Sequence, residues 1–121
     1  MPEQPSSESD AIVILSTTSG AEQARKIAAG LVESRLAACV NIVPLIQSIY
    51  HWKGKIVQDE EAMLFVKTRR ALFEKVKAAI RELHSYKLPE ILAFDIKKGE
   101  EGFLHWIYAC SAGAAAEEEE Q

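Results

Sequence analysis

The stretch IYHWKGKIV, residues 49–57, decides how this chain folds. Its aromatic and β-branched residues flank a Lys53-Gly54 pair, which is typical of a β-hairpin with a two-residue turn. Alternation along the first arm places Tyr50 and Trp52 on one face and Ile49 on the other, so both faces of the hairpin carry apolar side chains. A small antiparallel sheet normally covers one face and leaves the other to water. Something must therefore cover the second face of this hairpin.

The composition is that of one globular domain. The 121 residues are 48% hydrophobic and 26% charged, which suffices for a single core. The net charge of −4 argues against a nucleic-acid surface, which needs concentrated Lys and Arg. No apolar run is long enough to span a bilayer, and the N-terminus lacks a signal-peptide pattern. We expect a cytoplasmic protein with no nucleic-acid or membrane partner, whose two distant cysteines, Cys39 and Cys110, stay reduced.

Sequence of low complexity bounds the domain at both ends. Residues 1–10 are polar and contain proline, and residues 110–121 join small residues to an acidic run. Neither segment can bury enough apolar surface to order itself. We predict a disordered N-terminal tail at 1–10, a folded domain at 11–109, and a low-complexity acidic tail at 110–121 that favours solubility.

Apolar periodicity predicts six elements in the domain and a seventh at its end. The first is a run of apolar β-branched residues, the pattern of a central strand that is buried on both faces. The expected elements are a strand at 11–17, a helix at 19–36, strands at 39–52 and 55–68, a helix at 69–84, a strand at 91–96 and a helix at 99–109.

Single residues add detail to these elements. Ser19 and Glu22 form an S-x-x-E capping box at the start of the first helix. Gly30, inside that helix, is most simply explained by close approach of the helix to a strand. Pro44 cannot donate to a ladder and marks an edge or a bulge. The polar run at 58–61 leaves the continuity of the second long strand in doubt.

The order of the elements predicts the topology. Two β-α-β units joined through a hairpin, each with the usual right-handed crossover, give a four-stranded antiparallel sheet with both helices on one face. This is an α+β fold, a ferredoxin-like βαββαβ sandwich with an added C-terminal helix and a long β-hairpin. The helices cover one face only, so the apolar second face must meet another subunit or promote aggregation.

Five segments together resemble the CutA divalent-cation-tolerance family. They occur in order and at consistent spacing over essentially the whole predicted domain. The segments are RLAACVNIVP at 35–44, SIYHWKGKIVQDEE at 48–61, VKT at 66–68, H-x-Y-x-x-PEI at 84–91 and FLHWI at 103–107.

The resemblance implies a ferredoxin-like protomer in a tight homotrimer, with clefts at the subunit boundaries. It also implies heavy-metal tolerance, with copper and other divalent cations as ligands, and an architecture similar to that of trimeric nitrogen-regulatory signalling proteins. The family brings no established catalytic reaction and no obligatory cofactor. A non-enzymatic protein that binds a divalent metal such as copper or zinc is the first expectation.

Four residues are the candidate metal ligands. Cys39 matches the cysteine of the family's AACVN motif, and His84 matches the histidine of its H-x-Y-x-x-PE loop; thiolate and imidazole suit copper and zinc. Glu61 and Glu90 could complete a site with oxygen ligands. Each has a structural alternative: cysteine packs well in cores, a histidine after a helix complements the helix dipole, and acidic runs are mostly solvated.

The chain also departs from the family pattern. Some members carry a cysteine where this chain has Ser16 and a histidine where it has Leu83, so two soft or borderline ligands are missing. Ser85 and Lys87 replace a proline and an acidic or polar residue in the loop. Lys87 adds a cation where a metal ion prefers an anion. A metal site in this chain should be weaker or built differently.

Tyr50 and Trp52 are the predicted anchors of the trimer interface, because aromatic residues concentrate at the centre of protein contacts. Burial within the protomer is the alternative. A second function stays open: a signalling or scaffold trimer that binds a small metabolite or a protein partner. The sequence contains no glycine-rich phosphate loop and no G-x-S-x-G elbow, so no enzyme class is indicated.

Overall fold

Four strands and three α-helices follow one another in a computed structural model that describes residues 10–111. A short 3₁₀ turn precedes the second helix. Of the predicted tails at 1–10 and 110–121, residues 1–9 and 112–121 lie outside the described residues, whereas Cys110 belongs to the last helix. The elements are β1 Ala11–Thr18, α1 Ala21–Glu33, β2 Cys39–Trp52, β3 Lys55–Arg69, the 3₁₀ turn Arg70–Leu72, α2 Phe73–Leu83, β4 Ile91–Asp95 and α3 Glu101–Cys110.

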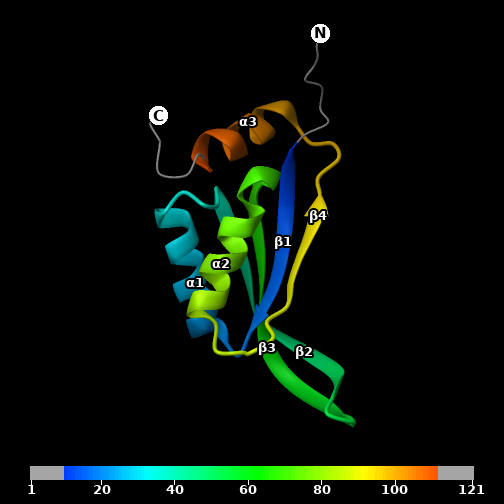
Figure 1. The fold of residues 1–121 in the computed structure, drawn as a ribbon. Coiled ribbons are helices and arrows are strands. Elements are labelled where there is room, and N and C mark those ends of the chain that lie inside the picture. Colours follow the sequence, from blue (N-terminus) through cyan, green and yellow to red (C-terminus); the bar gives the residue numbers. More distant parts are fainter. Residues whose placement is uncertain (1–9, 112–121) are drawn as a thin grey trace.

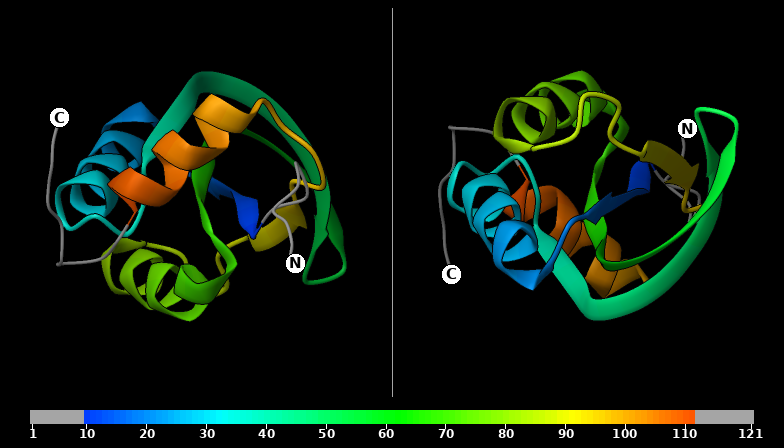
Figure 2. Two further views of the ribbon diagram at one scale, coloured as in Figure 1. Left: turned by 90° about the horizontal axis from the view of Figure 1, so that it is seen from above. Right: turned by 90° about the horizontal axis from the view of Figure 1, so that it is seen from below.

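The strands form one antiparallel sheet in the order β2-β3-β1-β4. This order confirms the predicted ferredoxin-like topology, with β1 inside the sheet between β3 and β4. Figure 1 shows α1 and α2 packed on one side of the sheet, α3 across its upper end, and the β2–β3 hairpin extending below. The views from above and from below show that the hairpin curves away from α1 and α2 (Figure 2). None of the helices in the described range could cross a membrane.

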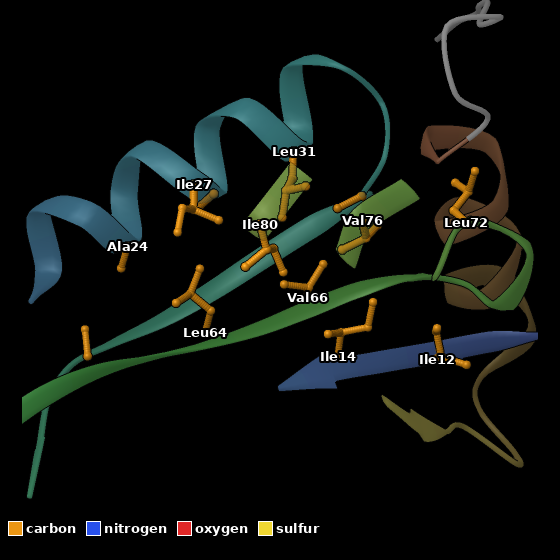
Figure 3. Close-up of a cluster of buried hydrophobic side chains, with 13 residues drawn as sticks. Ile12, Ile14, Ala24, Ile27, Leu31, Leu64, Val66, Leu72, Val76 and Ile80 are labelled. Atoms are coloured by element: carbon orange, nitrogen blue, oxygen red, sulfur yellow. The ribbon is translucent and has the colours of Figure 1, made fainter. Parts of the chain in front are cut away.

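The main core lies between the sheet and its two covering helices. Its largest buried side chains come from β1, β3, α1 and α2, and they point toward one another in Figure 3. Each contributes roughly 1.5–3 kcal/mol through burial of its apolar surface. They are Ile12, Ile14, Ile27, Leu31, Leu64, Val66, Val76 and Ile80.

A smaller cluster lies under α3. Leu104 and Ile107 of this helix pack against Ala11 and Ala38. Just beyond the helix, Ser111 is buried and its carbonyl accepts a 3.0 Å hydrogen bond from Arg69 Nε. Ordered contacts therefore continue past α3 to the last described residue.

The start of α1 differs from the predicted capping box. The N-cap is Gly20, and no side chain caps it. Thr18 Oγ1 donates to the Gly20 carbonyl at 2.8 Å, which fixes the bend between β1 and α1 and places Ser19 one residue too early to cap. Glu22 pairs with Arg25 instead, at 3.0 Å. The capping-box prediction was wrong.

Two further local predictions need correction. A Cβ on Gly30 would meet Leu83 of α2 at 3.7 Å, an ordinary contact with a helix, so close approach to a strand does not explain the glycine. The polar run at 58–61 does not interrupt β3, because its residues pair in register with Ile49, Ser48, Gln47 and Ile46 of β2. Backbone pairing continues there although the side chains are mostly exposed.

The hairpin and its bulge follow the sequence prediction. Lys53 and Gly54 both have positive φ, 51° and 80°, as a type I′ turn requires. The register of β2 shifts between Val43 and Ile46, around Pro44, which confirms the predicted bulge. Because β2 takes one extra residue there, Tyr50 and Trp52 keep the same face as Val43.

Candidate functional site

The face of the sheet turned away from α1 and α2 is apolar and largely uncovered. Along each strand its residues alternate with the residues whose side chains enter the core, and the strand pairings align them in rows across the sheet. Leu92 and Phe94 of β4 are 51% and 54% exposed. Within the described residues only α3 covers part of it, at the upper end. We call it the open face; its apolar residues are Val13, Leu15, Val43, Met63, Phe65, Leu92 and Phe94.

A phenol and a carboxylate meet at the lower end of the open face. The loop after α2 carries Tyr86, whose hydroxyl donates to Glu61 Oε2 at 2.7 Å. Glu61 is only 7% exposed, although it belongs to an acidic run. Burial, then the bond to Glu61, raise the pKa of Tyr86 well above its usual range. The phenol therefore stays protonated at neutral pH and remains a donor.

A second phenol and carboxylate pair lies farther along the hairpin. Tyr50 donates to Asp59 Oδ2 at 2.9 Å, and this bond is the main reason that the pKa of Tyr50 is raised. Asp59 and Glu61 share the open face because they are two residues apart in β3, whereas Glu60 between them points the other way. Neither Asp59 nor Tyr86 was predicted from the sequence as a site residue. Alternation from Tyr50 would have indicated Asp59.

His84 is held by hydrogen bonds on both ring nitrogens. Nδ1 accepts from the Tyr86 backbone N–H at 3.1 Å, and Nε2 lies 2.6 Å from the Thr17 carbonyl oxygen. A carbonyl can only accept, so we assign the proton of the neutral ring to Nε2. The His84 and Tyr86 rings also touch, with centroids 4.8 Å apart. A metal ion could bind His84 only if one of these bonds broke.

Cys39 lies at the opposite end of the sheet from His84. It pairs in register with Lys67, which pairs with Val13 on β1, whereas His84 contacts Thr17 four residues along the same strand. Four residues of strand span about 13 Å. The Cys39 thiol, half-buried and free, faces Asn41 Oδ1 at 3.7 Å. The structure does not bring these two predicted ligands together.

The four predicted ligands do not assemble within one protomer. Glu90 is half-buried just before β4 and makes no hydrogen bond or ion pair with any residue in the range 10–111. Over that same range, no three His, Cys, Asp or Glu side chains are grouped so that they could hold a metal ion. The lower end of the open face combines the carboxylates of Asp59 and Glu61 with the phenols of Tyr50 and Tyr86. A metal ion would need further ligands from outside the described part of one protomer.

Comparison with known proteins identifies the family. The family model for the CutA1 divalent ion tolerance protein matches residues 12–110, almost the whole described range. The chain belongs to the CutA1 family. Its sequence is 50% identical, over 95 residues, to the divalent-cation tolerance protein CutA of Thermus thermophilus, covering 78% of this chain and 92% of that protein. Mouse protein CutA is 42% identical over 70% of this chain, which spans only 48% of the mouse protein.

Solved CutA1 structures share the fold. The Thermus thermophilus protein superposes with a TM-score of 0.79 at 48% identity, covering 80% of this chain and 94% of that one. CutA1 from Oryza sativa gives a TM-score of 0.83 at 36% identity, covering 88% and 97%. The resemblance found in the five sequence segments and the predicted α+β sandwich are therefore both confirmed.

Proposed function

We propose that this CutA1 family member acts in divalent-cation tolerance as a non-enzymatic homotrimer that binds copper or zinc in clefts between its subunits. Family membership supports the tolerance role. The observation that carries the assembly is the open face, an apolar surface that a lone protomer leaves in water. The two cysteines of the protein form no disulfide, which suits a reducing compartment, and we therefore propose a cytoplasmic location.

The hairpin supports an assembly as well. Trp52 is 48% exposed and Ile56 is 70% exposed, on opposite faces of an arm that extends beyond the helices. Contiguous apolar surface of this kind marks protein interfaces. Neighbouring subunits that cover the open face and the hairpin would bury both, with Tyr50 and Trp52 as anchors.

A shared metal site is supported by how the donors are distributed. Glu61 uses one carboxylate oxygen for Tyr86, Glu90 has no partner among the described residues, and Cys39 is half-buried and free. His84 has both nitrogens engaged, so we rank it last among the four. Because these donors are dispersed in one protomer, a cleft between subunits is where they would combine.

Native mass spectrometry tests both parts of this proposal. We expect a trimer that gains a whole number of Cu²⁺ or Zn²⁺ ions, and we expect Cys39→Ser combined with Glu61→Gln to lose them. Cys110→Ser combined with Glu60→Gln makes the same chemical changes outside the four predicted ligands; it is the matched control and should keep the metal. A trimer that takes up no metal would leave the assembly standing and reject the metal role, and a monomer would reject the assembly.

The second candidate function is a scaffold or signalling trimer that binds a small metabolite or a protein partner. The observation that favours it is the pair of phenol–carboxylate contacts, since these groups can hydrogen-bond an organic ligand as well as one another. A thermal-shift screen of metabolites would detect it, because a ligand at a hundred times its Kd stabilises a protein by about 2.7 kcal/mol.

A further inference from the structure

Two cations on the open face have no ion-pair partner in the described range: Lys55, beside Trp52 at the tip of the hairpin, and Lys67, at the upper end. Lys67 of β3 stands in a row with Cys39, Val13 and Phe94 across the sheet. Its ammonium lies 5.7 Å from the Phe103 ring centroid, a contact that holds it over the upper end of the face. No carboxylate in the described range is within ion-pair distance of it.

Asp59 is the complementary anion on the same face. It is exposed, accepts one hydrogen bond from Tyr50, and pairs with no Lys or Arg of the described residues. Glu61 is the poorer partner for a neighbouring subunit, because it is buried and already bonded to Tyr86. Lys67 and Asp59 are eight residues apart along β3, about 26 Å, so they cannot meet within one protomer.

We propose that Lys67 of one subunit forms an ion pair with Asp59 of the neighbouring subunit when a second copy of this chain covers the open face. This rests on the assembly proposed above and adds which charges meet. A charge buried at an interface without a partner is strongly unfavourable. Both charges lie on a largely apolar surface, so a second copy that covers it should bring each charge to one of opposite sign. The pair would also fix the register between subunits.

Charge exchange in the full chain tests the pair. Assembly is followed by native mass spectrometry and sedimentation at a fixed urea concentration at which the wild type is half dissociated. We expect Lys67→Glu and Asp59→Lys each to raise the protomer concentration for half assembly at least tenfold, roughly the effect of losing a close charge pair. The double variant should return to within about threefold of the wild type.

Controls separate this inference from misfolding and from the proposed assembly. Lys75→Glu makes the same charge change on the exposed side of α2 and should leave assembly unchanged. If Lys67→Glu fails to fold by circular dichroism, Lys67→Met replaces it and should still weaken assembly. The ion pair would be overturned if either Lys67 variant assembled at the same protomer concentration as the wild type, or if the double variant did not regain assembly. A wild type that does not assemble would instead overturn the proposed trimer.

Discussion

The phenol of Tyr86 donates a 2.7 Å hydrogen bond to Glu61, and this contact joins the loop after α2 to the lower end of the open face. The same loop residue donates its backbone N–H to His84, whose ring in turn bonds to Thr17 at the end of β1. The loop is therefore tied to two strands through two adjacent side chains.

Removing the phenol should loosen this loop. We expect Tyr86→Phe to lower the free energy of unfolding by about 1 kcal/mol, because Glu61 loses a donor where it is shielded from water. Urea denaturation measures the change. Tyr50→Phe removes the equivalent bond at an exposed site and should have a smaller effect; an equal effect would contradict the role of burial.

The raised pKa of Tyr86 predicts a dependence on alkaline pH. A tyrosine whose folded-state pKa exceeds its unfolded value of 10.0 holds its proton more tightly when folded. Its contribution to stability is complete below pH 10 and is lost as the pH rises above 10 toward the folded-state pKa. Thermal unfolding followed from about pH 8 to about pH 11 should show a smaller loss in Tyr86→Phe than in the wild type. Parallel curves would contradict this assignment.

Arg35 occupies a backbone conformation that favours glycine. Its φ is 61°, just after α1 ends, where the chain turns through bonds from the Leu36 and Ala37 N–H groups to the Leu31 carbonyl. Arg35→Gly should raise the free energy of unfolding by roughly 0.5–1 kcal/mol, since glycine adopts this conformation without steric strain. Ser34→Gly, at φ −85°, is the control and should not stabilise. Chemical denaturation of the two variants decides the matter.

Two buried hydroxyls should respond in opposite ways to removal. Ser16 Oγ is buried without a hydrogen-bond partner in the described structure, whereas Thr68 Oγ1 donates to the Leu36 carbonyl at 2.7 Å. We expect Ser16→Ala to leave stability unchanged or raise it by up to about 1 kcal/mol, and Thr68→Val to lower it by about 1 kcal/mol. Differential scanning calorimetry compares them. A loss of stability in Ser16→Ala would contradict this prediction, because Ser16 lies on the core face of β1, beside Leu64.

The hairpin anchor gives a prediction on assembly. Trp52→Ala should dissociate or destabilise the proposed trimer by removing an aromatic side chain from its interface, at a cost of about 2 kcal/mol or more for a true anchor. Sedimentation and the melting temperature are the measurements. A variant that stays trimeric with an unchanged melting temperature would place Trp52 outside the interface.

Local chemistry made most of the fold predictable. The Lys53-Gly54 turn located the hairpin, the apolar run at the start located the inner strand, and Pro44 located the bulge. Predictions failed where a hydrogen bond that the residue pattern does not reveal decided the outcome, locally in one case and across the hairpin in the other. The turn from Thr18 to Gly20 displaced the cap at Ser19, and backbone pairing with β2 kept β3 continuous through its polar run.

The candidate site was harder to predict for the same reason. The chemistry of their side chains indicated His84 and Cys39 as ligands, but the hydrogen-bond partner of the His84 ring is Thr17, 67 residues away in the chain. Only the folded sheet shows that the two candidates lie at opposite ends. Their roles as ligands stay predictions, as does the interface role of Tyr50 and Trp52.

The bulge in β2 changes whether odd-numbered or even-numbered residues lie on the open face. Before it, the odd-numbered Cys39, Asn41 and Val43 lie on the open face; after it, the even-numbered Ile46, Ser48 and Tyr50 do. Relatives of this chain can therefore gain or lose one residue here while the hairpin keeps its orientation. The same single-residue change anywhere later in β2 would turn its aromatic side chains toward the opposite side of the arm, so length variation among relatives should be confined to this point.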